Sequence, residues 1–294
     1  MVKSRKEAVK SRKKPTGQRP RTSLRRKVLG QHFLTSGDVR DRIIRTLGAL
    51  KDSHVLEIGA GGGVLTWELA QRAGRLTALE IDSRLAGNLE QAFKEMPHVS
   101  ILGEDALRFD FTGWAKSCVP LEPVVVGNIP YRITNSLLHA LIGSHSRLES
   151  VVLMLQEEVA RKLSAPAGHK PYGMLTVLAG YHSKVEYLFH VGRENFSPPP
   201  NVDSAVVRLD FKQPCRCRAG DEAFFQALVR RLFLERRKQI QRILRKDQRF
   251  AVSAEQIERL EQDTGLRLSC RPEELTVEQL VTLADGLGSV KAKT

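Results

Sequence analysis

The segment Asn128-Ile129-Pro130-Tyr131 holds the side chains best suited to chemistry in this sequence, and it follows a run of three valines and a glycine. Asn128 offers an amide oxygen that can accept a hydrogen bond, the Pro130 carbonyl can accept another, and Tyr131 presents an aromatic face. Such a set can hold a flat base that carries an amino group. The same residues are also typical of a simple turn after a strand, because Asn and Pro are frequent turn formers.

A glycine-rich segment earlier in the chain could bind a cofactor. It reads Glu57-Ile58-Gly59-Ala60-Gly61-Gly62-Gly63 and joins a predicted strand to a predicted helix. Glycines let a nucleoside-like molecule approach the backbone closely, although glycine clusters also occur in ordinary turns. A dinucleotide fingerprint would require Gly or Ala where the chain has Val64, and the sequence has no GK[ST] of a phosphate-binding loop. The spacing therefore favours another kind of cofactor.

Acidic residues end the next two predicted strands. Glu80 can accept hydrogen bonds from both ribose hydroxyls of a nucleoside, and Asp105 can accept one from an adenine amino group. A single acid at a strand end is often only a helix cap. Two in succession favour a cofactor, and an uncharged nucleoside with a sulfonium suits two acids better than a pyrophosphate does.

Together these segments predict methyl transfer from S-adenosylmethionine to the exocyclic nitrogen of adenine. That nitrogen is a poor nucleophile because its lone pair is delocalised into the ring. Acceptors on Asn128 and Pro130, aimed at its two N–H bonds, would favour a pyramidal nitrogen. Positioning would supply most of the rate, no general base is required, and stacking on Tyr131 would contribute about 1–3 kcal/mol.

The elements that position these residues form an alternating pattern between residue 52 and about residue 211. Short apolar runs alternate with helical patterns, which predicts a doubly wound, Rossmann-like α/β domain with ligand sites at the carboxyl ends of its strands. The last two strands could form an antiparallel pair at one edge. We expect strands at 54–58, 76–81, 99–102, 124–127, 150–155, 185–189 and 204–209, and helices at 38–47, 64–72, 83–93, 135–141, 157–163 and 174–181.

A composition shift at 213–220 separates a second part in which only helical patterns occur, at 222–245, 254–262 and 272–283. The predicted organisation is a basic tail at 1–26, a methyltransferase domain at 27–211 and a small all-α domain at 212–294. We see neither a run long enough to span a membrane nor the apolar region of a secretory signal.

The charge of the chain is concentrated at its start. The net charge is +14, and residues 1–27 contain 12 Lys or Arg with Glu7 as their one acid. Such a segment is expected to be disordered and to contact RNA, although a solubilising tail or an organelle presequence remains an alternative. The four cysteines have no zinc-ligand spacing, so we expect free thiols, no metal site and a reducing, cytoplasmic setting.

A second basic surface is predicted in the all-α part. Read as one continuous helix, residues 228–250 place five cations in a narrow stripe opposite Leu232, Ile240 and Ile243. Glu235 and Asp247 fall outside this stripe, which favours phosphate contact over an ordinary solvated face. The five cations are Arg231, Lys238, Arg242, Arg245 and Arg249.

In these residues the chain resembles the adenine N6-dimethyltransferases of ribosomal RNA. The resemblance covers most of residues 27–245 and includes seven ordered motifs. They are Leu29-Gly30-Gln31-His32-Phe33-Leu34, the glycine segment, Glu80-Ile81-Asp82, Gly103-Glu104-Asp105-Ala106, Gly127 to Tyr131, Phe196-Ser197-Pro198-Pro199-Pro200-Asn201-Val202-Asp203-Ser204 and Arg236-Arg237-Lys238.

The resemblance implies S-adenosylmethionine as cofactor and assigns site residues. Cofactor contacts would come from His32, Leu34, Gly59, Gly61, Glu80, Asp105 and Asn128. Phe196 would pack near the target base, with core packing as the alternative, and Arg236, Arg237 and Lys238 would contact RNA. The sequence departs from the usual motifs at His32, where Asn is common and where protonation could matter, at Ala60 and at Asn135.

Two branches of this family differ in substrate. The form of the motif that contains Asp203, together with the Arg-Arg-Lys run, resembles the branch that methylates two adjacent adenines near the 3′ end of small-subunit rRNA during ribosome maturation. We therefore expect a monomer that acts on a pre-ribosomal particle. The alternatives are a large-subunit methyltransferase that confers macrolide resistance, a non-catalytic assembly or transcription factor, and a DNA adenine methyltransferase.

Overall fold

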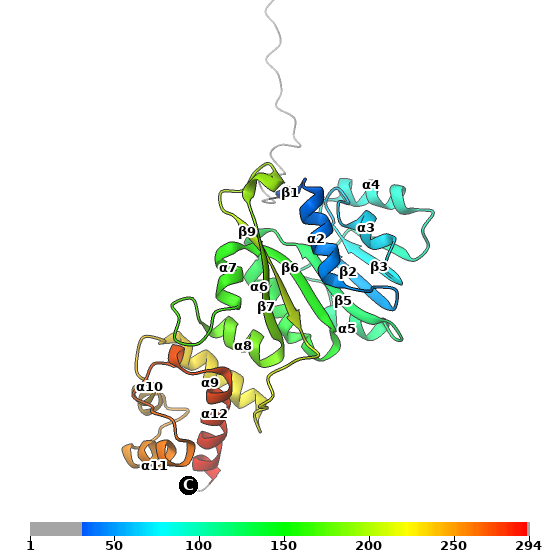
Figure 1. Ribbon diagram of the computed structural model, residues 1–294. Helices are drawn as coiled ribbons and strands as arrows, with labels where there is room; N and C mark the ends of the chain where they lie inside the picture. Colours follow the sequence, from blue (N-terminus) through cyan, green and yellow to red (C-terminus); the bar gives the residue numbers. More distant parts are fainter. Residues whose placement is uncertain (1–30, 293–294) are drawn as a thin grey trace, which may run out of the picture. The chain divides into compact units, whose positions relative to one another are not determined.

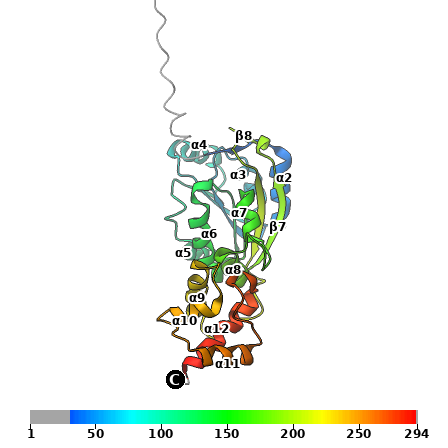
Figure 2. The same ribbon diagram turned by 90° about the vertical axis from the view of Figure 1, so that its left-hand side faces the viewer.

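The computed structural model describes residues 31–292, and the predicted basic tail lies outside them. Within this range the chain builds a seven-stranded sheet with helices on both faces, followed by a group of helices (Figures 1 and 2). The described residues contain no helix that is long and apolar enough to cross a membrane.

The sheet has the strand order of a doubly wound fold. It runs β4 (Val99–Leu102), β3 (Arg75–Leu79), β2 (Ser53–Ile58), β5 (Glu122–Asn128), β6 (Ser150–Gln156), β9 (Ser204–Asp210) and β7 (Lys184–Val191). The first five are parallel, and β9 is antiparallel to both of its neighbours, as the expected edge pair requires. The chain reverses its direction of winding between β2 and β5, where such folds bind ligands.

Successive strand residues point to opposite faces of the sheet, so each strand feeds two apolar clusters. Val55 joins the cluster beneath α2 (Gly37–Leu47), α3 (Thr66–Ala70) and α4 (Ser83–Phe93), whereas Leu56 joins the cluster on the other face. That second face is covered by α5 (Phe111–Ser117), α6 (Thr134–Gly143), α7 (Glu157–Leu163) and α8 (Met174–His182). Burial on both faces explains why these strands are continuously apolar.

The last four helices lie together next to α8 (Figure 1). They are α9 (Glu222–Leu234), α10 (Ile240–Lys246), α11 (Ala254–Thr264) and α12 (Val277–Ala292). Polar caps mark their starts: Asp221 accepts the Phe224 N–H in front of α9, and Ser253 with Gln256 forms a capping box in front of α11.

The prediction of one helix over 228–250 is wrong, because α9 ends at Leu234 and α10 begins at Ile240. The interruption contains neither Pro nor Gly, so the sequence carries no stop signal there. Tertiary contacts replace the helical hydrogen bonds instead: the Ile240 and Gln241 N–H groups donate to the carbonyls of Cys270 and Leu268, at 3.0 and 2.9 Å.

Smaller differences affect single elements. Helix α3 is shorter than expected, because residues before Thr66 complete the turn that follows the glycines, and α5 was not predicted. A two-stranded ribbon of β1 (Phe33–Leu34) and β8 (Phe196–Ser197) was not predicted either. Two-residue strands so far apart in sequence leave no periodic signal.

Candidate active site

The predicted site loops converge at one edge of the sheet. Ile58 is in register with Leu79 on one side and with Gly127 on the other. The chain that continues from each of these positions therefore enters the same region. The glycine segment, Glu80 and the segment from Asn128 to Tyr131 become neighbours for this reason.

The glycine segment adopts a backbone conformation that residues with side chains would disfavour. Gly61 has φ +58°, and a Cβ at this position would lie 3.1 Å from the ring of Phe33. Its N–H donates to Glu80 Oε2 at 2.8 Å, while the N–H groups of Gly59 and Ala60 donate to the Leu79 carbonyl. The turn thus places a backbone without side chains beside the Glu80 carboxylate, whose orientation the Gly61 N–H fixes.

The two acids at the strand ends differ in their surroundings. Glu80 is buried, and its oxygens accept the N–H groups of Gly61 and Asp82, both at 2.8 Å. Burial raises the pKa of Glu80, and these backbone donors oppose the shift. Asp105 is half-buried and accepts the Leu107 N–H through Oδ1 at 2.9 Å. A carboxylate oxygen can accept more than one hydrogen bond, and binding of a nucleoside would require this of both acids.

Asn128, the last residue of β5, has its amide oriented by a distant segment. Its Nδ2 donates to the His32 carbonyl at 3.0 Å. The amide oxygen Oδ1 therefore points elsewhere, and no hydrogen bond is made to it within residues 31–292. A half-buried acceptor held in this way is what an adenine amino group would require.

Pro130 and Tyr131 follow directly, with one correction to the expected geometry. The Pro130 carbonyl accepts the Ile133 N–H at 3.0 Å, because Tyr131–Ile133 forms a short 3-10 helix. The Thr134 hydroxyl also contacts this oxygen at a long 3.5 Å, so a base that donates to it would replace that weak contact. The half-buried Tyr131 ring lies 5.9 Å from the His32 ring with 29° between their planes, and burial raises the pKa of its hydroxyl.

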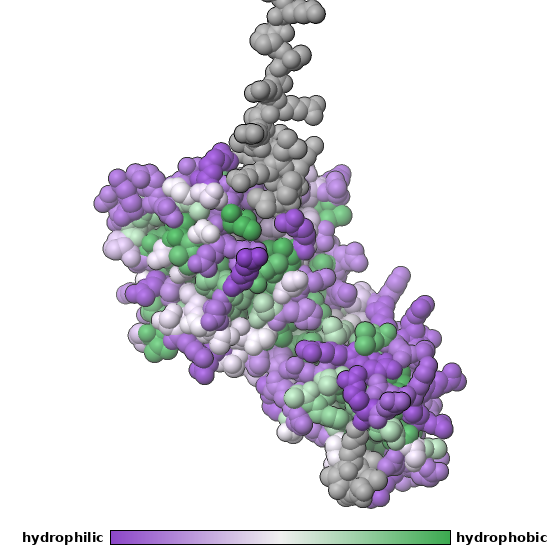
Figure 3. All heavy atoms as spheres, turned by 180° about the vertical axis from the view of Figure 1, so that it is seen from behind, coloured by the Kyte–Doolittle hydropathy of each residue, from purple (hydrophilic) through white to green (hydrophobic). Residues whose placement is uncertain are grey.

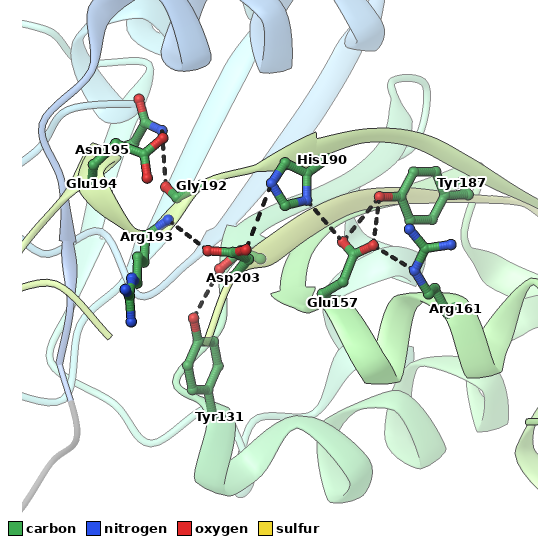
Figure 4. Close-up of polar contacts among 11 residues, drawn as sticks. Tyr131, Glu157, Arg161, Tyr187, His190, Gly192, Arg193, Glu194, Asn195 and Asp203 are labelled. Carbon is green, nitrogen blue, oxygen red and sulfur yellow. Dashed lines mark hydrogen bonds and ion pairs between the residues drawn. The ribbon is translucent and has the colours of Figure 1, made fainter. Parts of the chain in front are cut away.

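A network of polar side chains begins at the Tyr131 hydroxyl (Figure 4). Its hydroxyl contacts Ser204 Oγ at 2.8 Å, and Ser204 follows Asp203 at the start of β9. His190 lies between two carboxylates, with Nε2 3.8 Å from Asp203 Oδ2 and Nδ1 3.4 Å from Glu157 Oε2. The network ties the tyrosine to the antiparallel edge of the sheet.

The segment that begins at His32 approaches the site through the β1–β8 ribbon. His32 Nδ1 donates to the Pro198 carbonyl at 2.8 Å, which leaves Nε2 as the acceptor nitrogen in the neutral ring. Leu34 is buried opposite Phe196, and the Phe196 ring is only 3% exposed within the same apolar cluster. This burial favours the core-packing alternative for Phe196, and its contact with a target base stays a prediction.

Comparisons with known proteins match this arrangement. A sequence model described as ribosomal RNA adenine dimethylase matches residues 22–282. A protein of Alcanivorax borkumensis named ribosomal RNA small subunit methyltransferase A is 39% identical over 260 residues, covering 88% of this chain and 89% of that protein. The chain belongs to the ribosomal RNA adenine dimethylase family.

Further relatives agree with this assignment. A Bacillus licheniformis protein of the same name is 34% identical over 270 residues, covering 90% of this chain and 92% of that protein. The crystal structure of the 23S rRNA methyltransferase ErmE is 28% identical, with a TM-score of 0.69, and the match covers 87% of this chain and 99% of that one. The predicted family, fold class, enzyme class and S-adenosylmethionine cofactor are confirmed.

The structure adds one residue that the sequence-based assignment to this family did not single out. Glu57 lies within β2, is 2% exposed, and its Oε2 has no hydrogen-bond partner in the described part of the chain. Burial raises its pKa to about 7; the Thr66 hydroxyl opposes this shift and the Glu80 carboxylate adds to it. An acid inside the apolar run Val55-Leu56-Glu57-Ile58 was the available signal, since such positions are buried.

We expect Glu57→Gln to change how stability depends on pH. The folded-state pKa lies above the ordinary value of 4.5, so the folded protein holds a proton that the unfolded chain releases. The stability contributed by protonated Glu57 is therefore complete below about pH 4.5 and is lost as the pH rises through 7. Relative to the parent, the variant should gain about 2–3 kcal/mol between pH 5 and pH 8, measured by urea unfolding.

The exposed Glu90→Gln variant in α4 is the matched control and should show no such gain. The comparison uses the change between the two pH values because the buried Gln amide adds a cost of its own at every pH. A parallel pH dependence in the Glu57→Gln variant and the parent would contradict the assignment.

The predicted RNA-binding residues of the last helices divide into two groups. Arg237, Arg242 and Arg245 are exposed, as are Lys238 and Arg249, which pair with Glu235 and Asp247. Figure 3 shows that this helical part is mostly hydrophilic on the face seen there. The other two residues are engaged internally.

Arg231 and Arg236 make contacts within the protein. Arg231 is 15% exposed and binds Asp247 and Glu235, so its placement in an exposed stripe is wrong. Glu235 lies one helical turn after Arg231, and the break between α9 and α10 also brings Asp247 to it, which a continuous helix would have kept on another face. Arg236 donates to the Tyr172 carbonyl at 3.2 Å and lies 3.6 Å from Glu273.

We therefore expect Arg231→Met to affect folding and not RNA binding. Removing the guanidinium takes one of two partners from the largely buried Asp247, which keeps the Arg249 N–H at 2.9 Å. The loss should lower the free energy of unfolding by about 1–2 kcal/mol. The neighbouring Arg230 is exposed, and Arg230→Met should change it by less than about 0.5 kcal/mol. Urea unfolding of both variants measures the difference; equal values would refute the internal role.

Proposed function

We propose that this protein transfers methyl groups from S-adenosylmethionine to two adjacent adenines near the 3′ end of small-subunit rRNA during ribosome biogenesis. The observation that carries the proposal is the Asn128 amide, held by the His32 carbonyl with its oxygen left to accept. It lies between the glycine segment and Tyr131, at the reversal point of the sheet. The names of the 34–39% identical relatives support the small-subunit substrate.

The residues divide the work between donor and target. When bound, S-adenosylmethionine supplies an electrophilic methyl group on a sulfonium. Glu80 and Asp105 would hold the two ends of its nucleoside, and the glycine turn, with Gly59 and Gly61, would allow the close approach. His32 and Leu34, at the start of the β1–β8 ribbon, would contact the cofactor from the side of that ribbon.

The target adenine would enter beside Tyr131 and stack on its ring. It would donate its amino hydrogens to Asn128 Oδ1 and, in place of the Thr134 hydroxyl, to the Pro130 carbonyl. This pair of acceptors draws the nitrogen lone pair out of conjugation and directs it at the methyl group. Orientation accounts for the rate enhancement, with no proton acceptor needed before the methyl group transfers.

The partner in this proposal is a pre-ribosomal small subunit, bound by one copy of the chain. The exposed cations of the last helices would contact phosphates; they are Arg237, Lys238, Arg242, Arg245 and Arg249. Four free cysteines fit action in a reducing compartment, for which we propose the cytoplasm. The basic tail would add RNA contacts.

The test is transfer of radiolabelled methyl groups to small subunits that lack the modification, followed by nucleoside analysis. We expect N6,N6-dimethyladenosine in small-subunit rRNA. Incorporation confined to other nucleosides, or none above that of a heat-inactivated sample, would exclude the proposal.

A second candidate is methylation of a large-subunit adenine, favoured by the 28% identity and matching fold of ErmE. The same assay with protein-free large-subunit RNA distinguishes the two. Faster labelling of that RNA than of immature small subunits would support the ErmE-like substrate.

A further inference from the structure

A cluster of two histidines and a glutamate lies away from the active site, where three elements meet. His145 begins the short 3-10 helix His145–Arg147, His182 ends α8, and Glu222 begins α9. Each offers a ligand atom, and these atoms all lie within 4.8 Å of one another. The cluster thus connects the sheet-bearing part of the chain with its last helices.

His182 is the unusual member of this cluster. Its side chain is 2% exposed, its Nδ1 has no hydrogen-bond partner in the described chain, and its Nε2 lies 3.7 Å from Glu222 Oε1, beyond a hydrogen bond. Buried imidazoles are normally hydrogen-bonded, so a ring with neither nitrogen satisfied requires an explanation.

His145 is prepared to act as a ligand in a definite tautomer. Its Nδ1 lies 2.9 Å from the Ile142 carbonyl, which can only accept, so Nδ1 carries the proton and Nε2 carries a lone pair. A histidine that binds metal commonly donates its other nitrogen to a backbone carbonyl in this way. The two rings are close, with centroids 3.8 Å apart and 32° between their planes.

Glu222 supplies the negative charge and the opening to solvent, since its side chain is 38% exposed. Its Oε1 accepts a 3.4 Å hydrogen bond from Gln226, and its Oε2 lies 3.6 Å from the Arg218 guanidinium. Arg218 also donates to the Tyr181 carbonyl at 3.0 Å. The guanidinium opposes a bound cation, but it faces Oε2, so Oε1 remains directed toward His182.

We propose that His145, His182 and Glu222 bind a divalent transition-metal ion, Zn²⁺, which fastens the start of α9 to the end of α8. Neutral imidazole nitrogens and a carboxylate oxygen are preferred ligands of Zn²⁺, with water completing the coordination. Two ligands each about 2.1 Å from one ion lie at most about 4.2 Å apart, so small side-chain rotations bring the three atoms into range. The ion would bind the lone pair of His182 Nε2, the nitrogen that lies 3.7 Å from Glu222 Oε1 and makes no hydrogen bond in the described chain.

The test measures Zn²⁺ binding to the full-length, tag-free protein after chelator treatment, by equilibrium dialysis with elemental analysis. We expect one Zn²⁺ per chain. His145→Gln and Glu222→Gln should each weaken binding by about 10- to 100-fold. Zn²⁺ should also raise the unfolding temperature of the parent and not that of either variant, and both variants should keep the parent circular dichroism spectrum.

Two controls locate the site. His139→Gln removes an exposed imidazole from α6 and should leave Zn²⁺ affinity unchanged. Replacing Cys215 and Cys217 by Ser removes the thiols of the C-x-C segment that precedes α9, and should also leave it unchanged. Absence of Zn²⁺ binding in the parent, or binding lost with the cysteines and kept in both cluster variants, would overturn the proposal.

Discussion

Asn128→Ala is expected to lower the rate of methyl transfer by about 10²- to 10³-fold, the range that loss of one pre-oriented hydrogen-bonding group produces in other active sites. The substitution removes the acceptor that distinguishes the reactive from the planar form of the adenine amino group. Because the acceptor acts on the target, kcat should fall far more than the affinity for S-adenosylmethionine. Single-turnover methyl transfer together with equilibrium binding of the cofactor separates the two effects.

The matched control for this experiment is Asn88→Ala, which removes an exposed amide from α4. It should keep the parent rate. Asn128 also anchors the His32 segment, so thermal unfolding of both variants must be compared. A folded Asn128→Ala variant with near-parent activity would contradict the catalytic role of Asn128. A non-catalytic RNA-binding factor would then be the better interpretation.

Neutralising Arg242, Arg245 and Arg249 together should produce the second large effect, a loss of RNA affinity that is greatest at low salt. Each phosphate contact removed lowers the slope of log affinity against log salt concentration by about 0.7–0.9, so the slope should fall by about 2–3. Titration of the RNA substrate at four or more salt concentrations measures it. An unchanged slope would reject these residues as phosphate ligands.

Charge alone could weaken binding through the field of the whole protein, so the control must remove equal charge elsewhere. Lys51, Arg75 and Lys116 are exposed and belong to the end of the sheet where β2 and β3 begin, opposite the site loops. Replacing all three by Gln should lower affinity slightly and leave the slope close to that of the parent. Equal slopes for the two triple variants would point to a general charge effect.

Much of this site could be predicted from local patterns. Apolar runs that alternate with helical patterns predicted all seven strands of the main sheet to within two residues at each end. Because parallel strands place their carboxyl ends at one edge, the positions of Glu80, Asp105 and Asn128 along the chain already implied that they meet. Family motifs then restricted the chemistry to rRNA adenine methylation.

Other features depended on contacts between distant residues. The orientation of the Asn128 amide requires the His32 carbonyl, which the β1–β8 ribbon brings into place. Strands of two residues are too short to produce a periodic pattern in the sequence. The free Pro130 carbonyl expected from the sequence is partly occupied, because the next residues form a 3-10 turn. Local pattern could not indicate either contact.

The sequence by itself determined the positions of the strands along the chain, the glycine turn and the acids that follow it, since these depend on residue type and short-range spacing. Only the tertiary structure decided which charged groups face solvent. Arg231 has the periodicity of an exposed residue, yet the break before α10 brings Asp247 to it. The chain breaks before α10 without Pro or Gly because the carbonyls of Cys270 and Leu268 accept the N–H groups of Ile240 and Gln241. These hydrogen bonds between distant residues exist only in the folded chain.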